Sequence, residues 1–276
     1  KTCLITGGAG CIGSHLADEL LSRNCRVVVL DNLSLGRKSN LTSAMTNPNF
    51  KFVEGDILDE DTLNGIFAQN RFDMVFHLAA NSDIARSHAN PEIDLNMTFL
   101  TTFRVLEAMA DKRQTADVRV HLRHLQTGGA EVGENYGPLF PASHYGACKL
   151  ASEGVIASFA ENYGIQAFIT RFPNVCGERT THGILHDFVK KLRQNPLELE
   201  VLGNGKQAKP YLYVKDLVKA ILFVIDHTDD KINFFNLGVE GQTPVWKIAE
   251  MVISSMGLNA KIRYTGGDRG WGGGVP

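Results

Sequence analysis

The sequence predicts an α/β fold with a doubly wound parallel sheet and a smaller α/β lobe after it. Apolar runs typical of buried strands alternate with segments of helical spacing through the first two thirds of the chain. A glycine-rich turn joins the first of these strands to the first helix. Beyond Pro173 the pattern changes: shorter strand-like runs alternate with helical segments, and turn-forming sequences such as residues 203–205 separate them. We therefore expect a main domain over residues 1–172, with a returning segment near 211–237, and a lobe over residues 173–276.

Each expected strand of the main domain is a short apolar run, and each expected helix has apolar residues three or four positions apart. In chain order, the strands are expected at 2–6, 26–31, 51–54, 73–78, 118–122 and 166–171, and the helices at 12–23, 60–69, 92–110 and 145–162. After Pro173, strands are expected at 199–202, 211–214, 233–237 and 261–264, and helices at 183–194, 215–227 and 244–256.

The composition is ordinary for a globular protein and excludes several classes of partner. The 276 residues are 43% apolar and 21% charged, with a formal net charge of −2. No global basic field would recruit nucleic acid, and no apolar run has the length of a membrane span or the pattern of a signal peptide. Five scattered cysteines without a CxxC pair fit free thiols in a reducing compartment. We expect a cytoplasmic protein without membrane or nucleic-acid partners.

The glycine-rich turn, TGGAGCIG at residues 6–13, has the order strand, turn, helix that binds a dinucleotide pyrophosphate. Gly7 allows the tight turn, Gly10 lets the backbone approach the phosphates, and Gly13 lets helix and strand pack closely. The second apolar run ends in Asp31, eighteen residues beyond Gly13. A carboxylate there accepts hydrogen bonds from a ribose and repels a 2′-phosphate. The pattern therefore predicts a Rossmann-type domain that binds NAD in preference to NADP.

A second motif, Tyr145-Gly146-Ala147-Cys148-Lys149, lies in the helix expected at 145–162. Residues four apart share one face of a helix, so the Lys149 ammonium can lie beside the Tyr145 phenol. A neighbouring cation favours the phenolate, which a general base for alcohol oxidation needs. We interpret Tyr145 and Lys149 as catalytic residues.

Taken together, these motifs show that the chain resembles the extended short-chain dehydrogenase/reductase family, in its nucleotide-sugar epimerase and dehydratase branch. The resemblance covers essentially the whole chain. The segments that carry it are TGGAGCIG at 6–13, DNLSLG at 31–36, GD at 55–56, HLAA at 77–80, Asn96, YGACK at 145–149, RFPNVCG at 171–177, KPYLYVKD at 209–216 and DRGW at 268–271.

The resemblance implies roles for individual residues. Asp31 and Asn32 would hold the adenosine ribose, Asp56 and Ile57 the adenine, and Lys149 the nicotinamide ribose. Asn174 would contact the substrate diphosphate or the sugar, Arg269 would hold the diphosphate, and Lys209 stands where relatives often carry arginine. The full expected NAD-binding set is Gly7, Gly10, Cys11, Ile12, Gly13, Asp31, Asn32, Ser34, Gly36, Asp56, Ile57, Leu78, Ala79, Ala80, Asn96, Tyr145 and Lys149.

One stretch departs from the family pattern. Relatives carry an apolar strand that ends in a Ser/Thr cluster, whereas residues 118–129 interleave arginine and histidine with apolar residues, a pattern wrong for a central strand. Thr127 has the one hydroxyl in the right neighbourhood, eighteen residues before Tyr145, and is the candidate for the Ser/Thr role. A shifted register, a disordered loop, reduced activity or a corrupted stretch would each explain the departure. His121 and His124 lack a third ligand at suitable spacing, so we expect no metal site.

These inferences predict a nucleotide-sugar 4-epimerase of the UDP-glucose/UDP-galactose type, acting by transient oxidation at C4 with tightly held NAD. The alternatives are a 4,6-dehydratase or decarboxylase that shares the first oxidation, and a non-catalytic relative that binds NAD or nucleotide sugar. An acidic pair directly after Thr127, which a dehydratase would use, is absent from the sequence. The resemblance also implies a homodimer formed by the helices at 92–110 and 145–162. Met97, Phe99, Phe103, Leu106 and Met109 form an apolar helical surface in the first of these helices, and we expect core packing to account for most of it.

Overall fold

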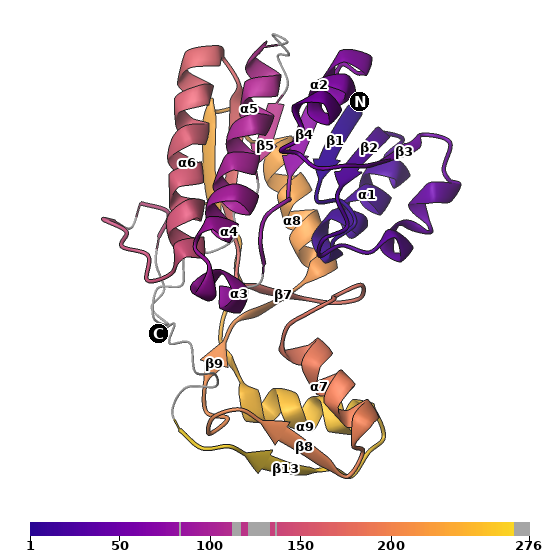
Figure 1. Ribbon diagram of the computed structural model, residues 1–276, viewed down its shortest axis with the longest axis vertical. Helices are drawn as coiled ribbons and strands as arrows, with labels where there is room; N and C mark the ends of the chain where they lie inside the picture. Colours follow the sequence, from indigo (N-terminus) through magenta and orange to yellow (C-terminus); the bar gives the residue numbers. More distant parts are fainter. Residues whose placement is uncertain (83, 112–116, 121–132, 136, 268–276) are drawn as a thin grey trace.

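The computed structural model describes residues 1–82, 84–111, 117–120, 133–135 and 137–267 (Figure 1). Its main sheet has seven strands in the order β11-β6-β5-β4-β1-β2-β3, and every pair in it is parallel. The strands are β1 (Thr2–Thr6), β2 (Arg26–Asp31), β3 (Phe50–Glu54), β4 (Met74–His77), β5 (Asp117–Val120), β6 (Gln166–Arg171) and β11 (Ile232–Asn236). This order confirms the predicted doubly wound parallel sheet.

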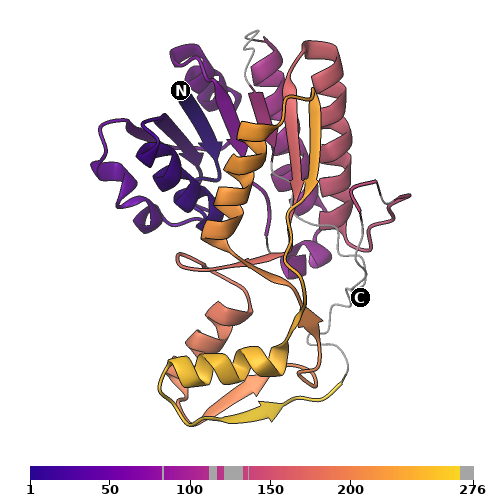
Figure 2. The same cartoon turned by 180° about the vertical axis from the view of Figure 1, so that it is seen from behind.

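Helices cover both faces of the sheet (Figures 1 and 2). The helices α1 (Cys11–Ser22) and α8 (Val214–His227) pack on one face, and α2 (Glu60–Gln69), α5 (Thr101–Asp111) and α6 (His144–Tyr163) on the other. Alternate residues of one strand enter the two cores: Leu4 faces α2, α5 and α6, whereas Cys3 and Ile5 face α1 and α8. Burial on both faces explains why these strands are continuous apolar runs.

The strand order reverses between β1 and β4, which are neighbours at the centre of the sheet. From β1 the chain proceeds outward to β2 and β3, and from β4 it proceeds the other way to β5 and β6. The carboxyl ends of β1 and β4 therefore diverge at a topological switch point, where ligands of such sheets bind. The glycine-rich turn and the residues after His77 meet there.

The helix expected at 92–110 is more complex than the sequence indicated. It comprises α4 (Glu92–Asp94), the π-helical segment η3 (Leu95–Leu100) and α5, and a short helix, α3 (Ile84–Ala89), precedes it. Apolar spacing does not distinguish a π turn from an α turn, so the sequence pattern could not reveal η3. Two short 3-10 helices that were also not expected, η1 (Lys38–Leu41) and η2 (Ala44–Thr46), follow β2.

Strand β5 lies at the centre of the sheet, between β4 and β6, although the sequence of this region interleaves charged and apolar residues. Its backbone pairs Val118 with Val75 on one side and with Ala167 on the other. The expected strand at 118–122 is therefore present over its first three residues. Thr127, His121 and His124 lie outside the described residues.

Beyond the carboxyl edge of the sheet, a separate group of elements has its own apolar core (Figure 2). It contains α7 (Ile184–Gln194), α9 (Val245–Ser255) and a parallel pair of strands, β8 (Glu198–Val201) and β13 (Lys261–Tyr264). Two small sheets connect it to the rest of the chain. These are β7 (Asn174–Cys176) with β10 (Tyr211–Tyr213), and β9 (Ala208–Lys209) with β12 (Thr243–Pro244).

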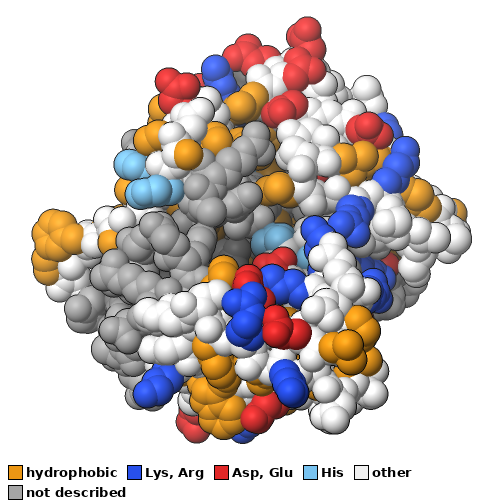
Figure 3. Space-filling view, turned by 60° about the horizontal axis from the view of Figure 1, so that its bottom comes forward, with side chains coloured by type: hydrophobic (Ala, Val, Ile, Leu, Met, Phe, Trp, Pro, Cys, Tyr) orange, Lys and Arg blue, Asp and Glu red, His pale blue; other side chains and the backbone are white. Residues whose placement is uncertain are grey.

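Acidic and basic side chains lie interspersed on the face shown in Figure 3, in keeping with the small net charge of the chain. Within the described part of the chain, no helix is long and apolar enough to cross a membrane. No three His, Cys, Asp or Glu side chains of that part lie close enough together to hold a metal ion.

Candidate functional site

The glycine-rich turn is built by close backbone contacts. Gly7 has φ +70°, and a Cβ there would lie 2.6 Å from the backbone nitrogen of Ala79. A Cβ on Gly13 would lie 2.6 Å from the carbonyl oxygen of Gly7, so helix α1 could not approach the turn. Gly10 is the N-cap residue of α1 and provides no side-chain capping bond. A Cβ there would meet the carbonyl oxygen of Gly7 alone, at 3.3 Å.

The start of α1 thus has N–H groups that no capping side chain satisfies and free space beside Gly10. Unsatisfied N–H groups and the positive end of a helix dipole are what a pyrophosphate needs. The residues present therefore fit the diphosphate of a dinucleotide. That Gly7, Gly10, Cys11, Ile12 and Gly13 bind it stays a prediction.

Asp31 ends β2 and joins this turn to the loop that follows. Its Oδ2 accepts a hydrogen bond from the Ala9 amide at 2.9 Å, and its Oδ1 accepts one from the Leu33 amide at 2.8 Å. Burial raises the pKa of the Asp31 carboxyl, and the two amides partly oppose that rise. Each carboxylate oxygen has a second lone pair, so both can still accept from ribose hydroxyls.

Replacing Asp31 with asparagine is expected to weaken the preference for NAD over NADP by at least about tenfold. The amide carries no charge to repel a 2′-phosphate, while its oxygen keeps one acceptor for the backbone. Dissociation constants for both cofactors, measured by titration calorimetry, would check this. An unchanged ratio of the two constants would show that the specificity does not come from this carboxylate.

The other residues expected at the adenosine end lie in the segments that follow β2 and β3. Asn32 Nδ2 donates to Asp56 Oδ2 at 2.9 Å, which joins the loops after β2 and β3. The Ile57 side chain is buried in the core. Ser34 is exposed, and a Cβ on Gly36 would lie 2.9 Å from Ala9.

The other wall of the switch point is the segment after β4. The Leu78 amide donates to the Thr6 carbonyl at 3.0 Å, so this segment leaves the sheet beside the glycine-rich turn. Leu78, Ala79 and Ala80 are half-buried. Asn96 lies on η3, where its side chain is exposed.

His77, the last residue of β4, is fully enclosed and held by two threonines. Its Nδ1 lies 2.7 Å from Thr6 Oγ1, and its Nε2 lies 3.1 Å from Thr102 Oγ1. Thr102 Oγ1 donates its proton to the Thr98 carbonyl at 2.8 Å and therefore accepts from Nε2–H. This assigns the proton to Nε2 and leaves Nδ1 as acceptor from Thr6. Burial, and secondly the charge of Lys149, lower the pKa of His77 to about 3.

Tyr145 and Lys149 lie in the first two turns of α6 and are both 4% exposed. Ser143 is the N-cap of this helix, and its hydroxyl accepts from the Gly146 amide at 3.0 Å. The Lys149 ammonium lies 5.7 Å from the centre of the Tyr145 ring. The structure therefore brings the phenol and the ammonium together, as the spacing of four predicted.

A buried ion pair fixes the same helix to the sheet. Arg171, at the end of β6, donates from Nε and Nη2 to the two carboxylate oxygens of Glu153 on α6, at 2.8 and 2.6 Å. Its guanidinium also lies over the Phe234 ring, 4.2 Å from the centre. Glu153 is one turn beyond Lys149, so this bidentate pair orients the part of α6 that carries the candidate catalytic residues.

The expected substrate-binding residues are placed at the junction with the lobe. Asn174 begins β7, opposite Tyr211 of β10, and is half-buried. Lys209 lies in β9, opposite Thr243 of β12, and is also half-buried. Arg269 and Thr127 lie outside the described residues.

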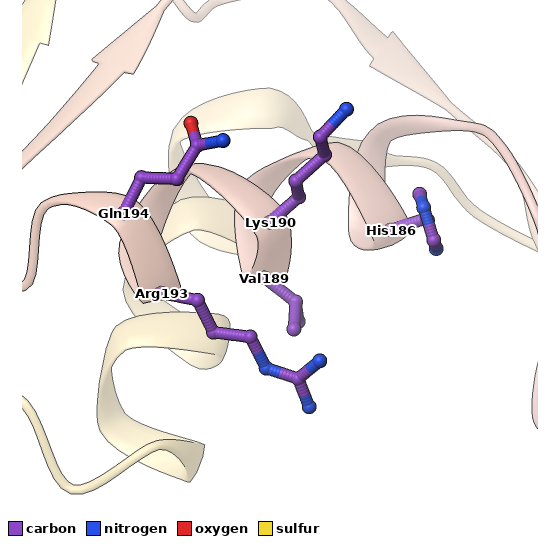
Figure 4. Close-up of a pocket in the computed structure, with 5 residues that line it drawn as sticks. All are labelled: His186, Val189, Lys190, Arg193 and Gln194. Atoms are coloured by element: carbon purple, nitrogen blue, oxygen red, sulfur yellow. The ribbon is translucent and has the colours of Figure 1, made fainter.

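A separate surface depression of about 310 Å³ lies along α7 (Figure 4). Its lining is His186, Val189, Lys190, Arg193 and Gln194, all from one face of that helix. None of these residues belongs to the expected site, and α7 lies in the lobe, away from the glycine-rich turn (Figure 1).

Sequence reasoning missed residues that support the site without belonging to its motifs. Thr102 is one of them, because nothing in a helical pattern shows that its hydroxyl reaches His77. Asn40 is another: its Nδ2 donates to the Ala9 carbonyl at 2.8 Å and to the Arg179 carbonyl at 3.4 Å. The one feature of the sequence that could have pointed to Asn40 is its position four residues after the DNLSLG segment.

Comparison with known proteins agrees with this geometry. The chain is 33% identical over 272 residues to a putative UDP-glucose 4-epimerase of Methanocaldococcus jannaschii, covering 95% of this chain and 84% of that protein. A crystal structure of a UDP-galactose 4-epimerase superposes with a TM-score of 0.84 and 36% identity, covering 96% of this chain and 86% of the other. UDP-glucuronic acid decarboxylase 1 of Arabidopsis thaliana is 28% identical over 278 residues, which cover 95% of this chain and 60% of that protein.

The profile of one protein family, described as the NAD dependent epimerase/dehydratase family, matches residues 3–238. It confirms NAD as the cofactor that the glycine-rich turn and Asp31 predicted. It also agrees with the Rossmann-like parallel sheet described above. The chain belongs to the NAD-dependent epimerase/dehydratase family, and is an NAD-dependent sugar epimerase or a related enzyme.

Proposed function

We propose that the protein is a nucleotide-sugar 4-epimerase that interconverts UDP-glucose and UDP-galactose. The observation that carries the proposal is the Tyr145–Lys149 pair, which is nearly excluded from water, with Lys149 close enough to His77 at the end of β4 for its charge to act there. A desolvated ammonium beside a phenol stabilises the phenolate, because Coulomb attraction is stronger where water is excluded.

In this proposal Tyr145, as phenolate, removes the proton from the sugar 4-hydroxyl and later returns it. NAD, which the glycine-rich turn, Asp31 and Lys149 would hold, would supply a hydride acceptor at C4 that can return the hydride to the opposite face of the sugar. Lys149 keeps the phenolate charged and would donate to the nicotinamide ribose. Thr127 would hydrogen-bond to the sugar oxygen that loses the proton. Proton and hydride both return, so the products are an inverted sugar and unchanged NAD.

Substrate binding would come mostly from the nucleotide diphosphate. We assign Asn174, Lys209 and Arg269 to this part of the substrate. Arg269 has the planar guanidinium suited to a diphosphate, and Lys209 provides a point charge. Holding the substrate by its diphosphate leaves the sugar free to turn over between the two hydride transfers.

Incubating the purified protein with UDP-galactose and assaying for UDP-glucose tests the proposal. We expect conversion to an equilibrium mixture, and no conversion above background by the Tyr145→Phe variant. Wild-type protein that converts no more sugar than this variant would rule out the epimerase.

The similarity to a UDP-glucuronic acid decarboxylase favours a second candidate, a decarboxylase or dehydratase that shares the oxidation at C4. Mass spectrometry of the product separates the candidates, because epimerisation conserves mass whereas dehydration loses water and decarboxylation loses carbon dioxide. A non-catalytic binding protein would bind NAD without ever producing the absorbance of reduced nicotinamide on addition of nucleotide sugar.

We propose a homodimer built on α5 and α6. Of the apolar residues expected there, Leu106 and Met109 lie in the core, and Phe103 packs edge-on against Phe159. Tyr163, at the end of α6, is 59% exposed and is available to a partner. We also propose a cytoplasmic location, which the five free cysteines support.

A further inference from the structure

The chain between β7 and α7, residues 177–183, crosses from the main domain into the lobe; we call it the strap. It lies against two parts of the NAD site that are far from it in the sequence. Cys11 Sγ, at the first position of α1, donates to the Glu178 carbonyl at 3.3 Å, and Thr180 Oγ1 lies 3.5 Å from the same sulfur. Thr181 Oγ1 donates to the Leu35 carbonyl at 3.4 Å.

The strap therefore touches both the helix start that fits the pyrophosphate and the loop that fits the ribose. Asn40 joins the strap to the same region, since its amide donates to the carbonyls of both Ala9 and Arg179. A dinucleotide bound at the glycine-rich turn and Asp31 would lie between the two regions that the strap bridges.

An ion pair anchors the strap to α1. Arg179 Nη2 lies 2.7 Å from Asp18 Oδ2, and the two side chains are 26% and 31% exposed. The other terminal nitrogen, Nη1, is buried without a hydrogen-bond partner among the described residues. The guanidinium is thus held by one contact, which a lysine could also make.

Glycines stand at both ends of the strap. Gly177 has φ +152°, and a Cβ there would lie 2.5 Å from Val214 Cγ1; Gly183 has φ +94°. Few side-chain-bearing residues adopt these conformations, so the two positions suit a change of chain direction. Between them, the strap has no regular secondary structure.

We propose that the strap is a gate for the cofactor, and that Arg179 is the positioning residue that holds it closed by pairing with Asp18. NAD then enters and leaves when the strap lifts from Cys11 and Leu35. This explains how an enzyme of this family could retain NAD between the removal and the return of a hydride. This inference requires only that the protein binds NAD, and it does not depend on which sugar the enzyme converts.

The test is the kinetics of NAD exchange on the full chain. Protein loaded with fluorescent etheno-NAD is mixed with excess NAD in a stopped-flow instrument, and association is measured separately. For Arg179→Ala we expect release to be about three- to tenfold faster, as for loss of a partly buried ion pair. A gate that limits passage in both directions predicts association faster by a similar factor and a dissociation constant changed by less than about twofold.

Three further variants make the result specific. Arg179→Lys should restore exchange to within about twofold of wild type, and Thr181→Val should accelerate it through an independent contact. Asp226→Asn breaks the Arg23–Asp226 pair, which lies at the other end of α1, and should leave exchange unchanged.

Unchanged exchange in both Arg179→Ala and Thr181→Val would overturn the gate, as would equal acceleration by Asp226→Asn. Faster release without faster association would also overturn it, because Arg179 would then act on bound NAD and not on access. None of these measurements needs turnover of a sugar, so a failed epimerase assay would not affect them.

Discussion

Replacing Tyr145 with phenylalanine is expected to lower kcat by about 10²–10⁴-fold, while NAD binding and thermal stability stay close to wild type. The ring that packs at the start of α6 is kept, and the change removes only the hydroxyl that would take the proton. The nearby Lys149 ammonium cannot replace it, because a cation that is already protonated does not accept a proton. The loss should therefore appear in kcat more than in KM.

The measurement is a steady-state assay with the product separated by chromatography, together with NAD binding by calorimetry. Tyr163→Phe is the matched control, because it removes a hydroxyl from the same helix at an exposed position stacked on Phe159. We expect this control to keep wild-type activity. A Tyr145→Phe enzyme with kcat within threefold of wild type would show that another group removes the proton.

Lowering the pH should destabilise the folded protein through His77. The pKa of this histidine is about 3 in the folded chain and 6.5 in the unfolded chain, so the unfolded state binds the proton more tightly between these values. This contribution to stability is complete above pH 6.5 and is lost as the pH falls toward 3. By linkage, the free energy of unfolding decreases by about 2 kcal/mol at pH 5 and about 3 kcal/mol at pH 4, relative to neutral pH.

Glutamine at position 77 isolates this contribution from those of other groups. Its amide oxygen can accept from Thr6 and its NH₂ can donate to Thr102, but it does not titrate in this range. Urea unfolding at pH 7, 5 and 4 should show that the difference between wild type and His77→Gln shrinks or reverses as the pH falls. His186→Gln, in the depression on α7, is the control and should follow wild type. Parallel curves for wild type and His77→Gln would contradict the assignment.

The sequence predicted those features of the fold and the site that follow from the spacing of neighbouring residues alone. A tight turn between a strand and a helix needs a residue without a side chain, whatever the rest of the fold is. A spacing of four on a helix places Tyr145 and Lys149 on one face before any packing is known. Continuous apolar runs show that strands are buried on both faces, which is enough to predict helices on both sides of a parallel sheet.

The sequence predicted less where the local structure depends on backbone geometry or on contacts between residues far apart in the chain. The π turn at Leu95–Leu100 has the same apolar spacing as an α-helix and looked like one. Strand β5 lies at the centre of the sheet although its region interleaves charged and apolar residues. Its position is defined by backbone pairing with β4 and β6, which the side-chain pattern does not show. The proton on His77 follows from which threonine donates elsewhere, and no sequence pattern contains that information.

The sequence by itself predicted the class of fold, NAD as the cofactor and the pair of residues expected to move a proton, because these depend on spacings of a few residues. The tertiary structure alone decided how Asp31 joins two loops, how Arg171 holds α6, and how the strap meets α1. Those contacts join residues far apart in the chain, for example Arg179 and Asp18. The packing of the helices on the sheet decides which distant residues come into contact, and these contacts cannot be predicted from local sequence propensity.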